Sequence, residues 1–348
     1  MANDARPLVY GPAYLDLVVT IDRAFCTSQR VDKSIKVNAV TPNTAGAIRL
    51  RGENGDDLHF PLPVEFHEYA ADCYLCETVL NNDELISDSY RVISVKCQLG
   101  GMGAGYALAL HGLLRHPLGT DTRGEFVRDA LQRNGVTALA EISPGTSDLS
   151  LVILGAEDKL TMGLRPRMTA WRATAEDIAH VSAASALCIC GAPNALTAIL
   201  LPHARNIPTM LAPSRRNIDD QVTPLADFAG AFSYLSLNRL EWEELPERQR
   251  WQRNTQVITI TDGPHGCRVL LPTGDEFSLP ALPHNGPADT NRCGETFAAA
   301  FFRTLLRESP TFHQHGVPPS LAMIAAEYAL AQAAKQLDIF EFGMPEMG

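Results

Sequence analysis

The sequence lacks both a long apolar segment and an excess of basic charge. No uncharged apolar run approaches the ~18 residues that a membrane-spanning helix requires, so we expect no membrane partner. Lysine and arginine number 29 against 40 aspartate and glutamate residues, a formal net charge of −11. So acidic a chain is poorly suited to grip phosphate backbones over a broad surface, which argues against nucleic acid. The polar segment 1–7 has no signal-peptide core behind it, and we expect a soluble, cytoplasmic protein.

Zinc-binding spacing is also missing, although the chain has eight cysteines. Cys73 and Cys76 form a C-x-x-C pair, and Cys188 and Cys190 form a C-x-C pair inside an apolar run. No second C-x-x-C and no H-x₃₋₅-H follows at zinc-finger spacing, and a thioredoxin-like context is lacking. Buried, reduced thiols are therefore a better interpretation of these cysteines than a metal or redox site.

What the chain does contain is an alternation of short aliphatic strands and helices. Strands are expected at 8–10, 149–154, 186–190, 209–212 and 257–260, and helices at 103–114, 125–134, 194–204, 294–306 and 320–336. This alternation predicts an α/β fold in which a mostly parallel sheet is covered by helices on both faces. Ligands of such folds bind at the carboxyl ends of the strands. No repeat or low-complexity linker divides the chain, so we expect a single domain over 1–348.

The stretch from Asp16 to Gly100 does not follow this alternation of strands and helices. It contains β-like segments at 18–22 and 34–40, followed by a tract at 49–68 that mixes charges, glycines and prolines. We expect a small excursion from the main sheet that forms a lid, a dimerisation flap, or both.

The strongest local signal is a turn that leads into an amphipathic helix, Asp289-Thr290-Asn291-Arg292-Cys293-Gly294-Glu295. The first-turn N–H groups of a helix are unpaired and its dipole favours negative charge, so this turn is a candidate anion site. Glu295 either caps the helix or accepts a proton from a substrate hydroxyl. Taken alone, this segment favours the cap.

Further motifs follow strands or open helices elsewhere in the chain. Thr261-Asp262-Gly263-Pro264-His265-Gly266 directly follows a strand, and its glycines let backbone approach a ligand. Asn238 and Glu241 lie at i and i+3, on one face of a turn. The pair Gly100-Gly101 opens a helix, and Asp16 follows the first strand.

In this order the motifs resemble those of the ribokinase-like (PfkB) family of carbohydrate and nucleoside kinases. The resemblance runs from about Leu8 to Gln336, interrupted by the long segment after Asp16. It rests on the stretches 11–16, 100–105, 119–124, 238–241, 261–266 and 289–297. It implies a three-layer α/β fold with a mostly parallel central sheet and a small β lid, with lid and insertion elements within about 17–97 and 147–168. It also implies that ATP and Mg²⁺ are used to phosphorylate a hydroxymethyl group of a sugar or nucleoside-like small molecule.

The resemblance assigns a role to each matching residue. Asp16 would hold acceptor hydroxyls, among the neighbouring acceptor-site positions Tyr14, Gly100, Gly101, Met102 and Gly105. Asn238 and Glu241 would order magnesium through water, and the nucleotide would lie along Thr261, Gly263, Gly266 and Asp289. Glu295 would act as the base, beside an anion hole formed by Arg292, Cys293 and Gly294.

Several of these residues depart from the family pattern. Glu295 stands in place of an aspartate, and the extra methylene moves its carboxylate; a misplacement of ~1 Å can cost ~100-fold in rate. Arg292 replaces a glycine, so it is strained if φ is positive, or its guanidinium itself faces the phosphates. Tyr14, Met102 and Gly105 replace polar residues, which suggests a flatter and more apolar acceptor wall.

On the strength of the ordered motifs, we prefer a PfkB-type kinase, a phosphotransferase with an alcohol group as acceptor. The alternative is a catalytically lapsed kinase-fold protein that serves as a ligand-binding or regulatory module, which an anion site covered by Arg292 would favour. A homodimer in which the tract 49–68 completes the neighbouring site is compatible with both.

Overall fold

The computed structural model describes most of the chain, with gaps concentrated between the second and ninth strands. The described ranges are 6–21, 30–31, 35–42, 47–52, 57–61, 73–76, 78–79, 92–154, 159–284 and 292–337. None of the helices in these ranges combines the length and the apolar character needed to cross a lipid bilayer.

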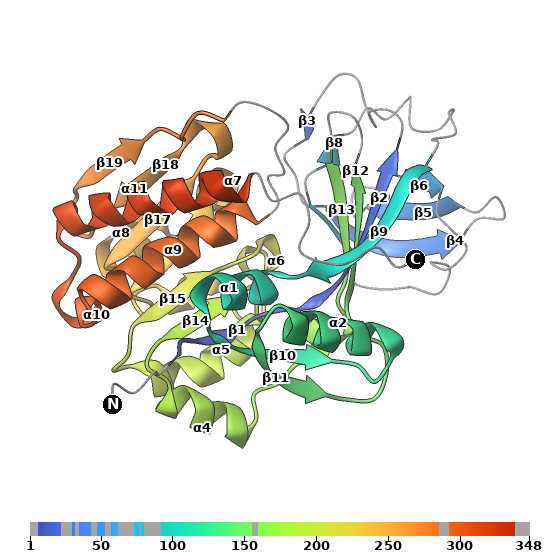
Figure 1. The fold of residues 1–348 in the computed structure, drawn as a ribbon, viewed down its shortest axis with the longest axis horizontal. Coiled ribbons are helices and arrows are strands. Elements are labelled where there is room, and N and C mark those ends of the chain that lie inside the picture. Colours follow the sequence, from blue (N-terminus) through green and yellow to red (C-terminus); the bar gives the residue numbers. More distant parts are fainter. Residues whose placement is uncertain are drawn as a thin grey trace.

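A nine-stranded sheet forms the centre of the described part of the chain (Figure 1). Its strands lie in the order β11 (Thr137–Ile142), β10 (Leu113–Leu118), β1 (Leu8–Tyr10), β14 (Leu187–Cys190), β15 (Thr209–Ala212), β16 (Tyr234–Asn238), β17 (Val257–Thr261), β18 (Cys267–Leu270) and β19 (Glu276–Leu279). Neighbours from β11 to β17 run parallel, whereas β17, β18 and β19 pair antiparallel. The mostly parallel α/β sheet predicted from the sequence is confirmed.

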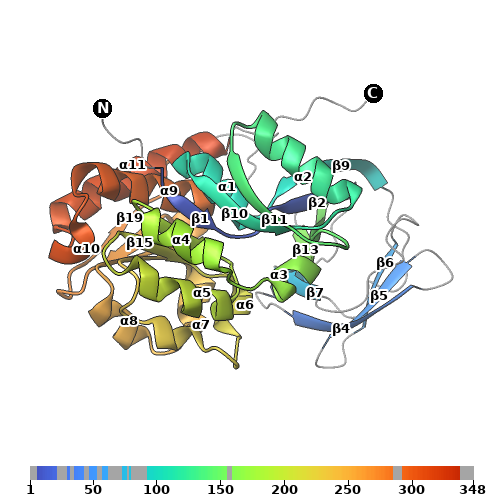
Figure 2. The same ribbon diagram turned by 90° about the horizontal axis from the view of Figure 1, so that it is seen from below.

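Helices cover both faces of this sheet, as the view from below shows (Figure 2). One layer contains α1 (Met102–Leu110), α2 (Thr122–Arg133), α9 (Cys293–Glu308) and α11 (Pro319–Gln336), and the other contains α4 (Ala175–Ala183), α5 (Asn194–Leu200), α7 (Arg239–Glu244) and α8 (Arg248–Asn254). The short helices α3 (Pro166–Ala170), α6 (Arg215–Ile218) and α10 (Phe312–His315) lie in the connections. Successive residues of β14 enter opposite cores, Cys188 on the α1 and α9 side and Ile189 on the α4 and α5 side. Burial on both faces explains why such strands are continuous apolar runs in the sequence.

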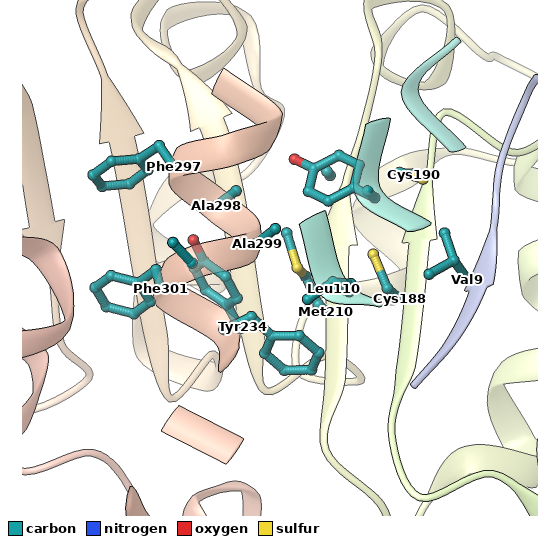
Figure 3. Close-up of a cluster of buried hydrophobic side chains, with 14 of the residues drawn as sticks. Val9, Leu110, Cys188, Cys190, Met210, Tyr234, Phe297, Ala298, Ala299 and Phe301 are labelled. Carbon is teal, nitrogen blue, oxygen red and sulfur yellow. The ribbon is translucent and has the colours of Figure 1, made fainter. Parts of the chain in front are cut away.

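Aromatic side chains fix α9 against the sheet. The ring centroids of Phe301 on α9 and Tyr234 on β16 are 5.1 Å apart. Figure 3 shows these rings together with Met210, Cys188 and Val9, which continue the same buried layer across the sheet. This packing determines where the first turn of α9 lies.

The excursion predicted after the first strand forms a second sheet beside the first (Figure 1). Its eight strands among the described residues lie in the order β6 (Asp57–Pro61), β5 (Ala47–Gly52), β4 (Ile35–Pro42), β7 (Cys73–Cys76), β13 (Lys159–Leu164), β12 (Leu149–Leu154), β2 (Tyr14–Ile21) and β9 (Val92–Gly100), and β3 (Arg30–Val31) pairs separately with β8 (Thr78–Val79). The β-like segments expected at 18–22 and 34–40 correspond to β2 and β4. The tract 49–68 contributes to β5 and β6, and its other residues lie outside the described ranges. The chain enters this sheet through residues 11–13, leaves it where β9 runs into α1, and returns to it for β12 and β13.

The helix predicted over 103–114 is too long at its carboxyl end. It ends at Leu110, where His111 adopts a left-handed conformation with φ 51°, and residues 113–118 form β10. The sequence concealed this strand because Arg115 and His116 interrupt its apolar pattern. In the structure Arg115 is buried and its Nε donates to Asp177 Oδ1 over 2.6 Å. Such pairing allows a charged residue inside a buried strand.

Candidate active site

The carboxyl ends of the parallel strands bring several of the predicted residues to one edge of the central sheet. Asn238 ends β16, Thr261 ends β17, and Gly191 follows β14. Residues 11–13 follow β1 at the same edge and lead into the second sheet. Edges of this kind are where open α/β sheets bind ligands.

The first turn of α1 is held against the segment that follows β1. A Cβ atom placed on Gly103 would lie 2.4 Å from the carbonyl carbon of Gly11, and one on Gly101 would lie 2.3 Å from Pro12 O. Ala104 N donates to Pro12 O over 3.2 Å. Gly101 also has φ 98°, a conformation that residues with a side chain rarely adopt. These glycines therefore let two backbones approach closely, and this contact fixes the junction of β9 and α1.

Asp16 lies at this junction, on β2. Its side chain packs directly on Gly100, because a Cβ atom on that glycine would come within 2.2 Å of Asp16 Oδ1. The backbone of Asp16 is paired with Gln98 on β9 and Ser150 on β12, and its side chain is buried. Two of the predicted acceptor residues, Asp16 and Gly100, are thus in direct contact.

Tyr14 shares its face of β2 with Asp16, and an arginine that the sequence analysis missed covers its ring. The Cζ atom of Arg165 lies 3.7 Å from the centroid of the Tyr14 ring. The guanidinium also passes over Gly163, where a Cβ atom would lie 2.8 Å from the same Cζ. A cation on an aromatic face is an electrostatically favourable contact. The expected apolar wall therefore carries a positive charge at Tyr14, while the sulfur of Met102 lies over Gly191 as an apolar contact.

A buried carboxyl group, Asp148, lies close to Arg165. Its two oxygens accept hydrogen bonds from the backbone N–H groups of Arg167, at 2.8 Å, and Met168, at 3.2 Å. Burial raises the pKa of Asp148 to about 6, although Arg165 and Arg216 act in the opposite direction. The sequence carries no motif that singles out this residue.

The first turn of α9 contains the predicted base and anion hole. Arg292 precedes the helix with φ 65° and ψ 4°, so the positive φ that the sequence analysis considered is present. Its side chain is buried, and Nη2 donates to the carbonyl oxygen of Leu99 on β9. The guanidinium is thus bound to the strand that carries Gly100. Residues 289–291, including Asp289, lie outside the described ranges.

The other residues of this turn differ in their surroundings. Among the described residues, which exclude 285–291, none lies within 4 Å of a Cβ atom placed on Gly294. Cys293 Sγ is 3.7 Å from Ala333 O on α11. The side chain of Glu295 extends toward α1, where a Cβ atom on Gly105 would lie 3.4 Å from its Cγ. A helix start with a carboxylate beside it suits an anion and a proton acceptor.

Asn238 and Glu241 form a reciprocal capping box at the start of α7. Asn238 Oδ1 accepts a hydrogen bond from Glu241 N, and Glu241 Oε2 accepts one from Asn238 N, each over 2.8 Å. The box holds one amide and one carboxylate side by side at the sheet edge, and oxygen donors of this kind suit Mg²⁺ with its waters. By donor chemistry, these two residues fit a magnesium site.

The loop after β17 is tied to the same helix. Arg239 Nε donates to Asp262 Oδ1 over 2.9 Å, and this contact joins α7 to the loop 261–266. Gly263 has φ 51°, and no described residue lies within 4 Å of a Cβ atom placed there. A Cβ atom on Gly266, with φ 97°, would lie 2.0 Å from Leu279 O. Gly263 therefore offers open backbone to a ligand, and Gly266 is required by the turn itself. Thr261 Oγ1 is 3.4 Å from Leu237 O.

The structure thus brings the predicted residues together in two groups. The first gathers around the junction of β9 and α1 and contains Tyr14, Asp16, Gly100, Gly101, Met102, Gly105, Arg292 and Glu295. The second lies at the ends of β16 and β17 and contains Asn238, Glu241, Thr261, Gly263 and Gly266.

The sequence profile of a family described as pfkB family carbohydrate kinase matches residues 74–334. A search of curated proteins finds no match.

Solved structures show the same fold. The chain is similar to ribokinase from Giardia lamblia, with a TM-score of 0.64 and 13% identity over 96% of this chain and 93% of that one. It is similar to Arabidopsis thaliana ribokinase complexed with ribose and ATP, with a TM-score of 0.59 and 16% identity over 96% and 99%. A Burkholderia thailandensis nucleoside kinase in complex with inosine gives a TM-score of 0.61 and 15% identity over 97% and 92%.

Proposed function

Because this chain belongs to the pfkB family of carbohydrate kinases, we propose that it transfers the γ-phosphoryl group of ATP to a hydroxymethyl group of a sugar or nucleoside-like small molecule. Its similarity to a ribokinase bound to ribose and ATP and to a nucleoside kinase bound to inosine supports this choice of donor and acceptor. Dimerisation through the second sheet and a cytoplasmic location stay predictions of the sequence.

The observation that carries the proposal is the convergence of three side chains on the short segment from Leu99 to Gly105. Asp16 packs on Gly100, Arg292 binds Leu99, and Glu295 extends along Gly105. An acceptor held by Asp16 would therefore lie beside the start of α9. That placement is what transfer of a phosphoryl group to an alcohol requires, because such catalysis is mainly positioning and charge stabilisation.

In this mechanism Asp16 orients the acceptor alcohol and Glu295 takes its proton. The alcohol oxygen forms a bond to the γ-phosphorus while the bond from that phosphorus to the bridging oxygen breaks, and ADP leaves. The first-turn amides of residues 292–295, at the positive end of the α9 dipole, stabilise the charge on the transferring group. None of the described residues fills the space over Gly294, where that group would lie.

The second group of residues would hold the nucleotide. Asn238 and Glu241 would bind magnesium through water, and the backbone at Gly263 would lie along the nucleotide. When bound, magnesium neutralises phosphate charge. The contact of Arg239 with Asp262 keeps the two elements in a fixed relation without contributing to the chemistry.

A first test measures the melting temperature with and without Mg·ATP, since it requires no knowledge of the acceptor. A ligand at 100 times its Kd adds ~2.7 kcal/mol. With an unfolding entropy of ~2.1 cal/mol/K per residue, this is a rise of about 4 °C for 348 residues. A magnesium-dependent rise would support the proposal. No shift at millimolar ATP would contradict it and would indicate a kinase-fold binding protein.

A second test addresses the base directly. Glu295→Gln keeps the size of the side chain and removes the proton acceptor, so we expect ADP release with a responsive acceptor to be lost. The nucleotide-dependent rise in melting temperature should remain, because the first-turn amides are unchanged. Turnover equal to that of the unmodified protein would exclude Glu295 as the base.

A further inference from the structure

The side chain of Glu295 lies along α1 at Gly105, where the helix has no side chain. A Cβ atom on Gly105 would be 3.4 Å from Glu295 Cγ, 3.5 Å from its Cβ and 3.9 Å from its Cδ. Three successive carbons of Glu295 therefore pass the position that a side chain at residue 105 would occupy. The contact belongs to the close packing of α1 against α9.

The room at this position is strictly limited. A methyl group on Gly105 would just reach van der Waals contact with Glu295, because 3.4 Å is the lower end of the ordinary range. Any larger side chain would have to displace the glutamate. The packed surroundings make such a displacement costly, since Gly105 and its neighbours Ala104 and Tyr106 are all buried.

The charge of Glu295 also affects the groups around it. Tyr106 is buried, and its pKa is raised first by that burial and next by the charge of Glu295. The pKa of Cys190 on β14 is raised mainly by burial, with the hydrogen bond and charge of Cys188 and then the charge of Glu295 adding to it. The charge of Glu295 thus acts on buried groups of both α1 and the central sheet.

We propose that Gly105 is a positioning residue for the base. Because residue 105 has no side chain, α1 leaves a space in which the longer side chain of a glutamate at position 295 can lie, and we call this space the seat. The two residues form a matched pair, in which the added methylene of Glu295 is accommodated by the space left at residue 105. The inference rests on the proposed kinase function for its catalytic meaning, whereas the seat itself is a packing relation.

A double-mutant cycle tests the pairing with Gly105→Asn, Glu295→Asp and the double variant. Gly105→Asn should lower kcat by ~100-fold while leaving the KM for ATP unchanged, because it displaces the base and not the nucleotide. In the double variant the shorter aspartate no longer needs the seat. Its kcat should therefore exceed, by at least ~10-fold, the value expected from multiplying the two single effects.

Two further variants separate size from general disturbance. Gly105→Ala should lower kcat far less than Gly105→Asn, since its methyl group only touches Glu295. Ala109→Asn adds the same side chain one turn later on α1 and should leave the kcat of the folded enzyme within about two-fold. If Gly105→Asn does not fold, Gly105→Ser takes its place in the cycle. Independent, multiplicative effects, or full activity of Gly105→Asn, would overturn the pairing.

The same variants distinguish failure of this inference from failure of the proposed function. If the unmodified protein transfers no phosphoryl group to any acceptor tested, the function fails, but the melting temperatures of the cycle still report the seat. In that case the decrease in melting temperature of the double variant should be clearly smaller than the sum of the decreases in the two single variants. Additive decreases in melting temperature would show that residues 105 and 295 do not depend on each other for packing.

Discussion

Replacing Arg292 by glycine and by alanine measures the backbone strain at the start of α9. Its φ of 65° and ψ of 4° place Arg292 in the left-handed region, which costs a residue with a side chain roughly 1–2 kcal/mol. Both variants lose the same guanidinium and its hydrogen bond to Leu99. The difference between them therefore isolates the strain, and we expect glycine to be the more stable by about 1 kcal/mol.

Both variants should be less stable than the unmodified protein. A hydrogen bond from a charged group contributes ~1.5–3 kcal/mol, whereas glycine regains only the expected difference of about 1 kcal/mol. With an unfolding entropy of ~2.1 cal/mol/K per residue, the gap between Gly and Ala corresponds to about 1.5 °C in melting temperature.

Urea unfolding of the three proteins, checked for equal slopes, gives the free energies directly. If Arg292→Ala were as stable as Arg292→Gly, the backbone could not be held at positive φ. If Arg292→Gly were more stable than the unmodified protein, the bond to Leu99 would contribute less than the strain costs.

Two further predictions concern magnesium and pH. Glu241→Gln preserves an oxygen acceptor for the capping box, so it should leave stability nearly unchanged while raising the magnesium concentration needed for nucleotide binding. Asn238→Ala should raise that concentration as well, and it should also cost ~1 kcal/mol of unfolding free energy because the cap is lost. Equal magnesium titrations in all three proteins would contradict this role. Burial lowers the pKa of His116 to about 3, so the stability this residue provides as a neutral group is lost as pH falls below ~6.5, by ~1.4 kcal/mol per pH unit. Asp148, with its pKa raised to about 6, acts oppositely: it adds stability at low pH that is lost as pH rises through 6. Relative to the unmodified protein, Asp148→Asn should lose stability as pH falls from 6 to 4, and His116→Phe should gain it. Urea unfolding across this range checks both, and parallel pH profiles would refute the assignments.

The sequence by itself determined the class of fold and the order of the motifs. Aliphatic runs such as 187–190 are readable because strands buried on both faces need apolar residues at every position. The amphipathic spacing of α9 and the glycines of the loop 261–266 are local properties, and local properties are written in neighbouring residues. The same reasoning failed at β10, because the apolar pattern was broken by Arg115, whose partner Asp177 is far away in the chain.

Only the tertiary structure decided how the candidate site is assembled. Arg165 covers the ring of Tyr14, Asp16 packs on Gly100, and the side chain of Arg292 reaches Leu99, 193 positions earlier in the chain. Glu295 was predicted as a departure in length, and the structure places its side chain along Gly105, on a different helix. No spacing rule connects such residues, because their contacts arise from the packing of α1, α9 and the second sheet. The chemistry of the residues is local, whereas the distances that chemistry depends on are set by the whole fold.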